Sequence, residues 1–246
     1  MQHEHISKRF DAELENVRSR VLQMGGFVEQ QIERALEALT SGNAALMDQV
    51  IADDHRVNGM EVSIDEECSM IIARRQPTAV DLRMMMTVIK IITDLERVGD
   101  EAEKIARMAK LMYQGDRLTS PRLTEIRHAA DLALAMLRES LDAFARLDVA
   151  AAARVVRQDQ RVDEEFRSIL RQLITFMMED PRTITMALEI VFIAKAIERI
   201  GDHAKNMAEY VVYMVQGRNV RHVKFEEWER DTDTHSATIS HSDSAL

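Results

Sequence analysis

Two copies of a short acidic motif contain the residues most able to do chemistry in this sequence. Glu96 and Asp100 flank Arg-Val-Gly, and Glu198 and Asp202 flank Arg-Ile-Gly further along the chain. Residues four apart share a helix face, where two like charges weaken an isolated helix by roughly 0.2–0.5 kcal/mol. A glycine inside a helix costs about 1 kcal/mol more. Because the chain carries both costs twice, we interpret each acidic pair as half of a metal or ion site. The alternative is a solvent-exposed face with a small residue at a helix crossing.

A second polar pair precedes the first motif, and helix geometry predicts that the two pairs meet. Asp54 and Asn58 are four residues apart, and Pro77 lies midway between this pair and the acidic motif. In an antiparallel hairpin that turns at Pro77, Asp54 is level with Asp100 and Asn58 is level with Glu96. The sequence therefore predicts one cluster of oxygen ligands between two helices.

The second half of the chain repeats this arrangement. Asp159 and Asp163 precede the second motif, and the turn signal Asp180-Pro181 lies midway between the two pairs. A hairpin there places Asp159 level with Asp202, and Asp163 level with Glu198. The eight predicted metal ligands are Asp54, Asn58, Glu96, Asp100, Asp159, Asp163, Glu198 and Asp202.

The oxygen donors of these clusters favour particular metals. Carboxylates suit hard or borderline cations such as iron, manganese, magnesium or calcium better than metals that prefer thiolates. Di-iron carboxylate bundles use Glu-x-x-His motifs, and no histidine is placed for one here. His203 lies about 100° round the helix from Asp202, so we expect it to be exposed. Interleaved arginines offer another way to relieve the repulsion between carboxylates: Arg56, Arg97, Arg161 and Arg199.

The elements that position these residues are predicted to be helices throughout. From Ser7 onward apolar residues recur every three or four positions, the period of an amphipathic helix. Cap residues, prolines and glycines divide the pattern, and residues 1–6 are expected to form a loose lead-in. The predicted helices begin near Ser7, Asn43, Pro77, Pro121, Asp148 and Pro181, and the last one ends near Gly217.

The polar pairs, turn signals and apolar positions of the first half all recur in the second half, which indicates an internal duplication. We therefore expect an all-α fold of two tandem three-helix bundles with long antiparallel helices. The first bundle is expected to cover 7–116 and the second 117–217. Residues 218–246 form a polar tail that contains Trp228, and its composition predicts disorder.

Composition limits the function further. Hydrophobic residues make up 46% of the 246 positions, aromatics make up 4%, and there are three prolines, a balance typical of a helical protein. The net charge of -10 argues against nucleic-acid binding, which requires a basic face. Cys68 is the one cysteine, so no intrachain disulfide can form and a reducing compartment is favoured. Without a signal-like or membrane-spanning apolar run, the protein is predicted to be cytoplasmic.

With Glu-Arg-(Val/Ile)-Gly-Asp in the third helix of each half and Asp-x-x-x-(Asn/Asp) in the second, the sequence resembles the PhoU family. The resemblance covers roughly residues 7–215. It implies two tandem three-helix bundles with multinuclear metal clusters, which hold iron in some members. Asn58 departs from the family's acidic pattern, and the resemblance therefore predicts weaker metal binding at the first site.

The resemblance also implies a function. PhoU-like proteins are negative regulators of the phosphate-starvation (Pho) response and of phosphate uptake. They are thought to connect the ATPase subunit of the high-affinity phosphate ABC transporter to a membrane-bound sensor histidine kinase. The absence of a phosphate-binding loop or a nucleophile constellation in the sequence agrees with an adaptor that is not an enzyme.

Two other functions are open at this stage: a metal-dependent enzyme that uses the paired carboxylates, and a metal-binding or inert scaffold. The apolar and methionine positions predict a homodimer.

Overall fold

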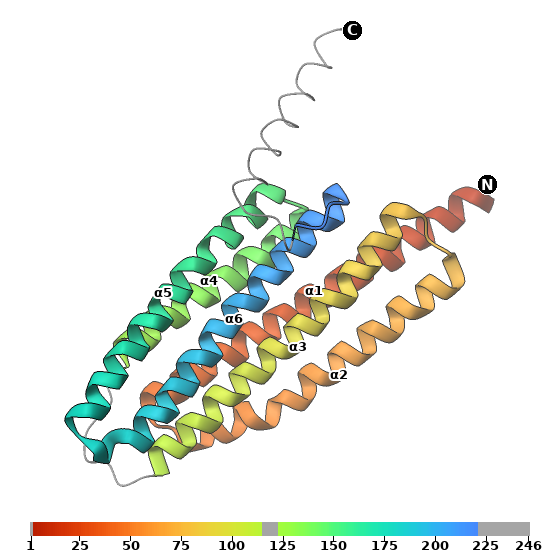
Figure 1. Cartoon of the computed structure of the whole chain (residues 1–246). Helices are drawn as coiled ribbons and strands as arrows, with labels where there is room; N and C mark the ends of the chain where they lie inside the picture. Colours follow the sequence, from red (N-terminus) through yellow and green to blue (C-terminus); the bar gives the residue numbers. More distant parts are fainter. Residues whose placement is uncertain (1, 115–122, 221–246) are drawn as a thin grey trace, which may run out of the picture.

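The computed structural model describes residues 2–114 and 123–220, with side chains from residue 8 onward (Figure 1). Within this part of the chain there are six α-helices and one short 3-10 turn, Pro181–Thr183, that leads into the last helix. The helices are α1 (Gln2–Ser41), α2 (Ala44–Arg75), α3 (Ala79–Gln114), α4 (Thr124–Arg146), α5 (Val149–Glu179) and α6 (Ile184–Gln216).

Local signals explain most of the helix ends. The side chain of Asn43 accepts a hydrogen bond from the backbone N–H of Leu46, and that of Asp148 accepts one from Ala151. Both residues are N-caps, as predicted. Gly217 ends α6 in the left-handed conformation at φ 71°, which favours glycine because it has no Cβ.

The start of the chain differs from the prediction. α1 begins at Gln2, so the expected loose lead-in over residues 1–6 is wrong for the described residues. The physical reason is that no proline or glycine precedes Ser7, so nothing interrupts the propagation of a long helix toward its N-terminus. The predicted start signal at Pro121 lies outside the described residues, as do Trp228 and nearly all of the predicted tail.

The six helices form two bundles that lie side by side. α1, α2 and α3 pack together, as do α4, α5 and α6, and the bundles meet chiefly through α3 and α6. These two helices run antiparallel along the centre of the molecule (Figure 1). α1 also contacts α4.

One continuous hydrophobic core runs through both bundles. It includes buried residues of both central helices, such as Ile91 and Ile92 on α3 and Ile197 on α6. The two helices that carry the acidic motifs are therefore the two at the centre of the fold. No described helix is long and apolar enough to cross a membrane.

Candidate metal sites

The first candidate site lies between α2 and α3, and the structure brings its four predicted residues together. Asn58 Nδ2 donates a hydrogen bond to Asp54 Oδ2 over 3.2 Å. Burial raises the pKa of Asp100, and the negative charge of Asp54 on the neighbouring helix raises it further. Burial also raises the pKa of Glu96, with further contributions from Asp100 and Asp54. The hairpin thus aligns the two pairs as the midpoint at Pro77 predicts.

The donor atoms of this site fit a hard cation. Asp54 Oδ1 and Asn58 Oδ1 are both buried, and neither has a hydrogen-bond partner among the described residues. A buried oxygen without a partner is costly, and carboxylate and amide oxygens are the ligands of hard cations. However, no three His, Cys, Asp or Glu side chains in the described ranges already form a metal-binding group. Binding would therefore require the side chains to move closer together.

Two further carboxylates belong to this site, and the sequence analysis missed them. The charge of Glu61 raises the pKa of Glu96, and the charge of Glu103 raises the pKa of Asp54 and of Asp100. Glu61 lies one helical turn beyond Asn58 on α2, and Glu103 lies one turn beyond Asp100 on α3. Helical spacing alone could have identified both residues.

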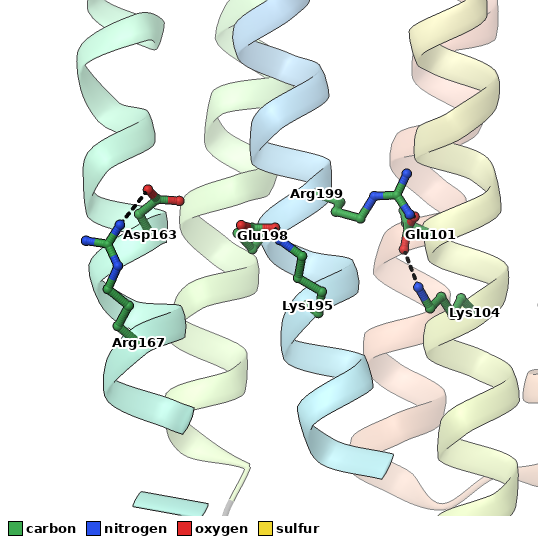
Figure 2. Close-up of polar contacts among 7 residues, drawn as sticks. All are labelled: Glu101, Lys104, Asp163, Arg167, Lys195, Glu198 and Arg199. Atoms are coloured by element: carbon green, nitrogen blue, oxygen red, sulfur yellow. Dashed lines mark hydrogen bonds and ion pairs between the residues drawn. The ribbon is translucent and has the colours of Figure 1, made fainter. Parts of the chain in front are cut away.

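The second candidate site lies between α5 and α6. Burial raises the pKa of Asp202, and the charges of Glu198, Asp159 and Asp163 raise it further, against a lowering by Lys195. Asp159 is 7% exposed. Asp163 and Glu198 lie on the facing sides of α5 and α6 (Figure 2). The structure therefore brings together all four predicted residues of the second half as well.

Cations of the same chain already contact these carboxylates, a feature that the sequence analysis missed. Lys205 Nζ lies 2.6 Å from Asp159 Oδ2, and Lys195 Nζ lies 2.5 Å from Glu198 Oε2. Burial lowers the pKa of Lys205, but the hydrogen bond and charge of Asp159 more than offset this and hold the pKa above its usual value. Helical spacing could have signalled the contact of Lys195 with Glu198, one turn away on α6, but not that of Lys205 with Asp159 on α5.

Comparison with known proteins identifies the duplicated unit. The family model for the PhoU domain matches the chain twice, at residues 21–109 and 126–211. The chain belongs to the PhoU family. Each match contains one of the two candidate sites, which confirms the internal duplication and the all-α fold of two repeats.

PhoU relatives resemble this chain over nearly their whole length. A phosphate-specific transport system accessory protein PhoU homolog from Pseudomonas aeruginosa is 49% identical over 221 residues, 89% of this chain and 90% of the relative. The accessory protein PhoU of Escherichia coli is 46% identical over 226 residues, 92% of this chain and 93% of the relative. These names are those of accessory proteins and not of enzymes, in agreement with the sequence analysis.

Solved PhoU structures share the fold. The crystal structure of PhoU from Pseudomonas aeruginosa has a TM-score of 0.81 at 48% identity and covers 85% of this chain and 100% of its own. The crystal structure of the phosphate transport system regulatory protein PhoU from Streptococcus pneumoniae has a TM-score of 0.79 at 26% identity. The match covers 86% of this chain and 99% of that structure's chain.

In this PhoU chain His203 lies where the sequence analysis did not expect it. The prediction of an exposed side chain is wrong, because His203 is 7% exposed and its Nδ1 lies 2.8 Å from Asp94 Oδ1 on α3. The rotation away from Asp202 was predicted correctly. The side chain of His203 points toward the first bundle. The position of that bundle cannot be predicted from the second repeat alone.

Two of the interleaved arginines, Arg97 and Arg199, also turn toward this contact between α3 and α6, and Arg56 turns toward α1. Arg199 Nη1 lies 2.7 Å from Glu101 Oε1, across the contact between the bundles (Figure 2). Arg97 Nη1 lies 3.6 Å from Asp94 Oδ1, and Arg56 stacks over the ring of Phe27. Their closest partners are therefore not the predicted ligands.

Proposed function

We propose that this protein is a negative regulator of the phosphate-starvation (Pho) response and of phosphate uptake. In this role it is a cytoplasmic adaptor between the ATPase subunit of the high-affinity phosphate ABC transporter and a membrane sensor histidine kinase. The observation that supports this proposal is near full-length similarity to accessory proteins of phosphate-specific transport. An adaptor needs surfaces and not a reaction centre, which suits a fold of long packed helices.

We further propose that the paired carboxylates bind a hard cation such as iron, manganese or magnesium. The ligands would be Asp54, Asn58, Glu96 and Asp100 in the first repeat and Asp159, Asp163, Glu198 and Asp202 in the second. Such a cation would neutralise carboxylates whose pKa values are now raised by burial and by one another. It would thereby hold the two helices of each hairpin at a constant distance and shape the surface that a partner meets.

Two structural expectations accompany this proposal. The first is the division of the chain into bundles at 7–116 and 117–217. The second is a homodimer, which is supported by exposed apolar side chains on α6 such as Leu188 and Phe192. A sedimentation measurement on the full chain would test the second expectation directly.

The regulatory role is tested in phosphate-replete cells that lack the gene. We expect high alkaline phosphatase activity in these cells and its return to the low level when the wild-type protein is supplied. Asp54→Ala/Asp100→Ala, supplied in the same way, tests the carboxylates, and Glu15→Ala, at an exposed position of α1, is the matched control. Low activity in the deletion strain would rule out the negative regulator.

The partners are tested separately by cross-linking in cells, followed by purification of the full chain. Recovery of a transporter ATPase and of a sensor histidine kinase is the expected result. Repeated failure to recover either one would contradict the adaptor role, even if the deletion strain behaves as expected.

A further inference from the structure

The two candidate metal sites hold the same motif but differ in the residues one turn away from it. On α6, Lys195 lies one turn before Glu198, and Lys205 lies one turn after Asp202. The corresponding positions on α3 are Thr93 and Glu103. At these positions one repeat has two lysines, whereas the other has a neutral hydroxyl and an acid, Glu103, that pairs with Arg107.

Both lysines contact predicted ligands. Lys205 reaches across from α6 to Asp159 on α5, a residue that is 7% exposed. Lys195 binds Glu198 on its own helix, and its ammonium also lies 5.4 Å from the centre of the Phe166 ring. An ammonium beside an aromatic face gains a cation–π attraction, so Lys195 is held at the site from two sides.

The residue two turns after the first ligand of each hairpin shows the same contrast. After Asp159 this position holds Phe166, which partners Lys195, whereas after Asp54 it holds Glu61, whose charge acts on Glu96. Thr93 in the first repeat instead donates its hydroxyl hydrogen bond to the backbone carbonyl of Ile89. At three matched positions, the first repeat therefore carries two more carboxylates and the second carries two lysines and the aromatic ring.

We propose that Lys195 and Lys205 are built-in counter-ions of the second site, and that the first site therefore binds a hard divalent cation more tightly than the second. This inference rests on the proposed metal binding. It reverses the order of affinities expected from Asn58 alone, because one neutral ligand matters less than two resident positive charges. A divalent cation entering the second site must displace both ammonium groups from Asp159 and Glu198 or approach them against like-charge repulsion. At the first site it meets the unpaired oxygens of Asp54 and Asn58.

The experiment is a titration of the full-length protein with Mn²⁺, in which the free ion is followed by electron paramagnetic resonance. We expect wild-type protein to bind Mn²⁺ at the first site at least about tenfold more tightly than at the second. Asp54→Asn/Asp100→Asn should remove the tight binding. The matched pair Asp159→Asn/Asp202→Asn should retain it.

Substitution of the lysines tests their role directly. Lys195→Gln/Lys205→Gln should add a second tight Mn²⁺, whereas Lys195→Arg/Lys205→Arg, which keeps both charges, should not. The reciprocal change Thr93→Lys/Glu103→Lys should abolish tight binding at the first site. If the glutamine variant unfolds because Asp159 is left buried without its partner, Mn²⁺ should restore its helical circular dichroism, and failure to do so would contradict the inference.

The remaining outcomes separate this inference from the proposed function. Equal affinity of the two sites in wild-type protein, or loss of tight binding in Asp159→Asn/Asp202→Asn, overturns the inference and leaves metal binding intact. If wild-type protein shows no measurable Mn²⁺ binding, both this inference and the proposed metal binding are overturned.

Discussion

α3 and α6 each carry charged side chains on two faces, and the carboxylates on these two faces have different neighbours. Where the helices face each other, acids meet partners from the other bundle: Asp94 meets His203, and Glu101 meets Arg199. Where α3 faces α2, acids meet other acids, as the raised pKa values of Asp54, Glu96 and Asp100 show. Where α6 faces α5, acids also gather, but Lys205 and Lys195 contact two of them, Asp159 and Glu198.

This comparison separates charges that hold the fold together from charges available for binding. Asp94 and Glu101 are 1% and 4% exposed, and a buried charge persists only if it is paired. The carboxylates of the first candidate site are more accessible and repel one another, which destabilises the folded protein slightly. Repulsion retained at the first site has a reason outside folding, and the proposed cation binding would provide one.

The largest effect is expected from the contact between the bundles. Asp94→Ala leaves His203 buried without its partner and should lower the free energy of unfolding by about 3 kcal/mol. Urea denaturation followed by circular dichroism measures this change. Arg97→Ala, at the exposed neighbour 3.6 Å from the same carboxylate, is the control and should change stability by less than about 0.5 kcal/mol. Equal stabilities for Asp94→Ala and wild type would show that the contrast between the two faces does not hold.

A smaller loss is expected at Glu101. Glu101→Gln removes its ion pairs with Arg199 and Lys104, but both cations remain partly in water. We therefore expect a decrease of about 1–2 kcal/mol in the free energy of unfolding, again by urea denaturation. Glu15→Gln, which breaks an exposed pair with Arg18, is matched in chemistry and should have no measurable effect. If Glu101→Gln lowered the free energy of unfolding no more than Glu15→Gln does, the ion pair between the bundles would have no structural role.

The smallest effect is expected at the first candidate site, where the substitution should increase the free energy of unfolding instead of decreasing it. Burial and the charge of Glu103 raise the pKa of Asp54, so the ionised form is disfavoured in the folded protein. A carboxyl group with a raised folded-state pKa contributes stability at low pH that is lost as the pH rises through that pKa. Asp54→Asn should therefore stabilise the protein at pH 7, by less than about 1 kcal/mol because the site is partly solvated.

The pH dependence provides the check on this prediction. The advantage of Asp54→Asn over wild type should shrink as the pH falls through the raised pKa of Asp54, and urea denaturation at pH 7 and at lower pH would show it. A variant that is less stable than wild type at pH 7 would mean that the ionised carboxylate is paired after all. The site would then resemble the contact between the bundles.

Much of this molecule follows from local rules and could be predicted from the sequence. Helix caps at Asn43 and Asp148 depend on neighbouring residues, and the levels of the acidic pairs depend on counting from the turn near Pro77. Gly99 and Gly201, the glycines of the two acidic motifs, permit close helix approach. Both are buried, and a Cβ on either would lie 3.2 or 3.3 Å from a valine methyl group of the neighbouring helix. Chain connectivity determines all of these features, because a short turn sets the register of the hairpin that follows it.

The tertiary structure alone decided how the two bundles meet. Periodicity shows that α3 and α6 have apolar faces, but it does not show which residues at the edge of those faces lie opposite each other. The burial of His203 and the pairing of Arg199 with Glu101 depend on the fit of two whole surfaces that are far apart in sequence. Lys205 likewise finds Asp159 only because α6 turns that side toward α5. The sequence by itself therefore determined where the acidic sites lie, and packing decided which charges neutralise them.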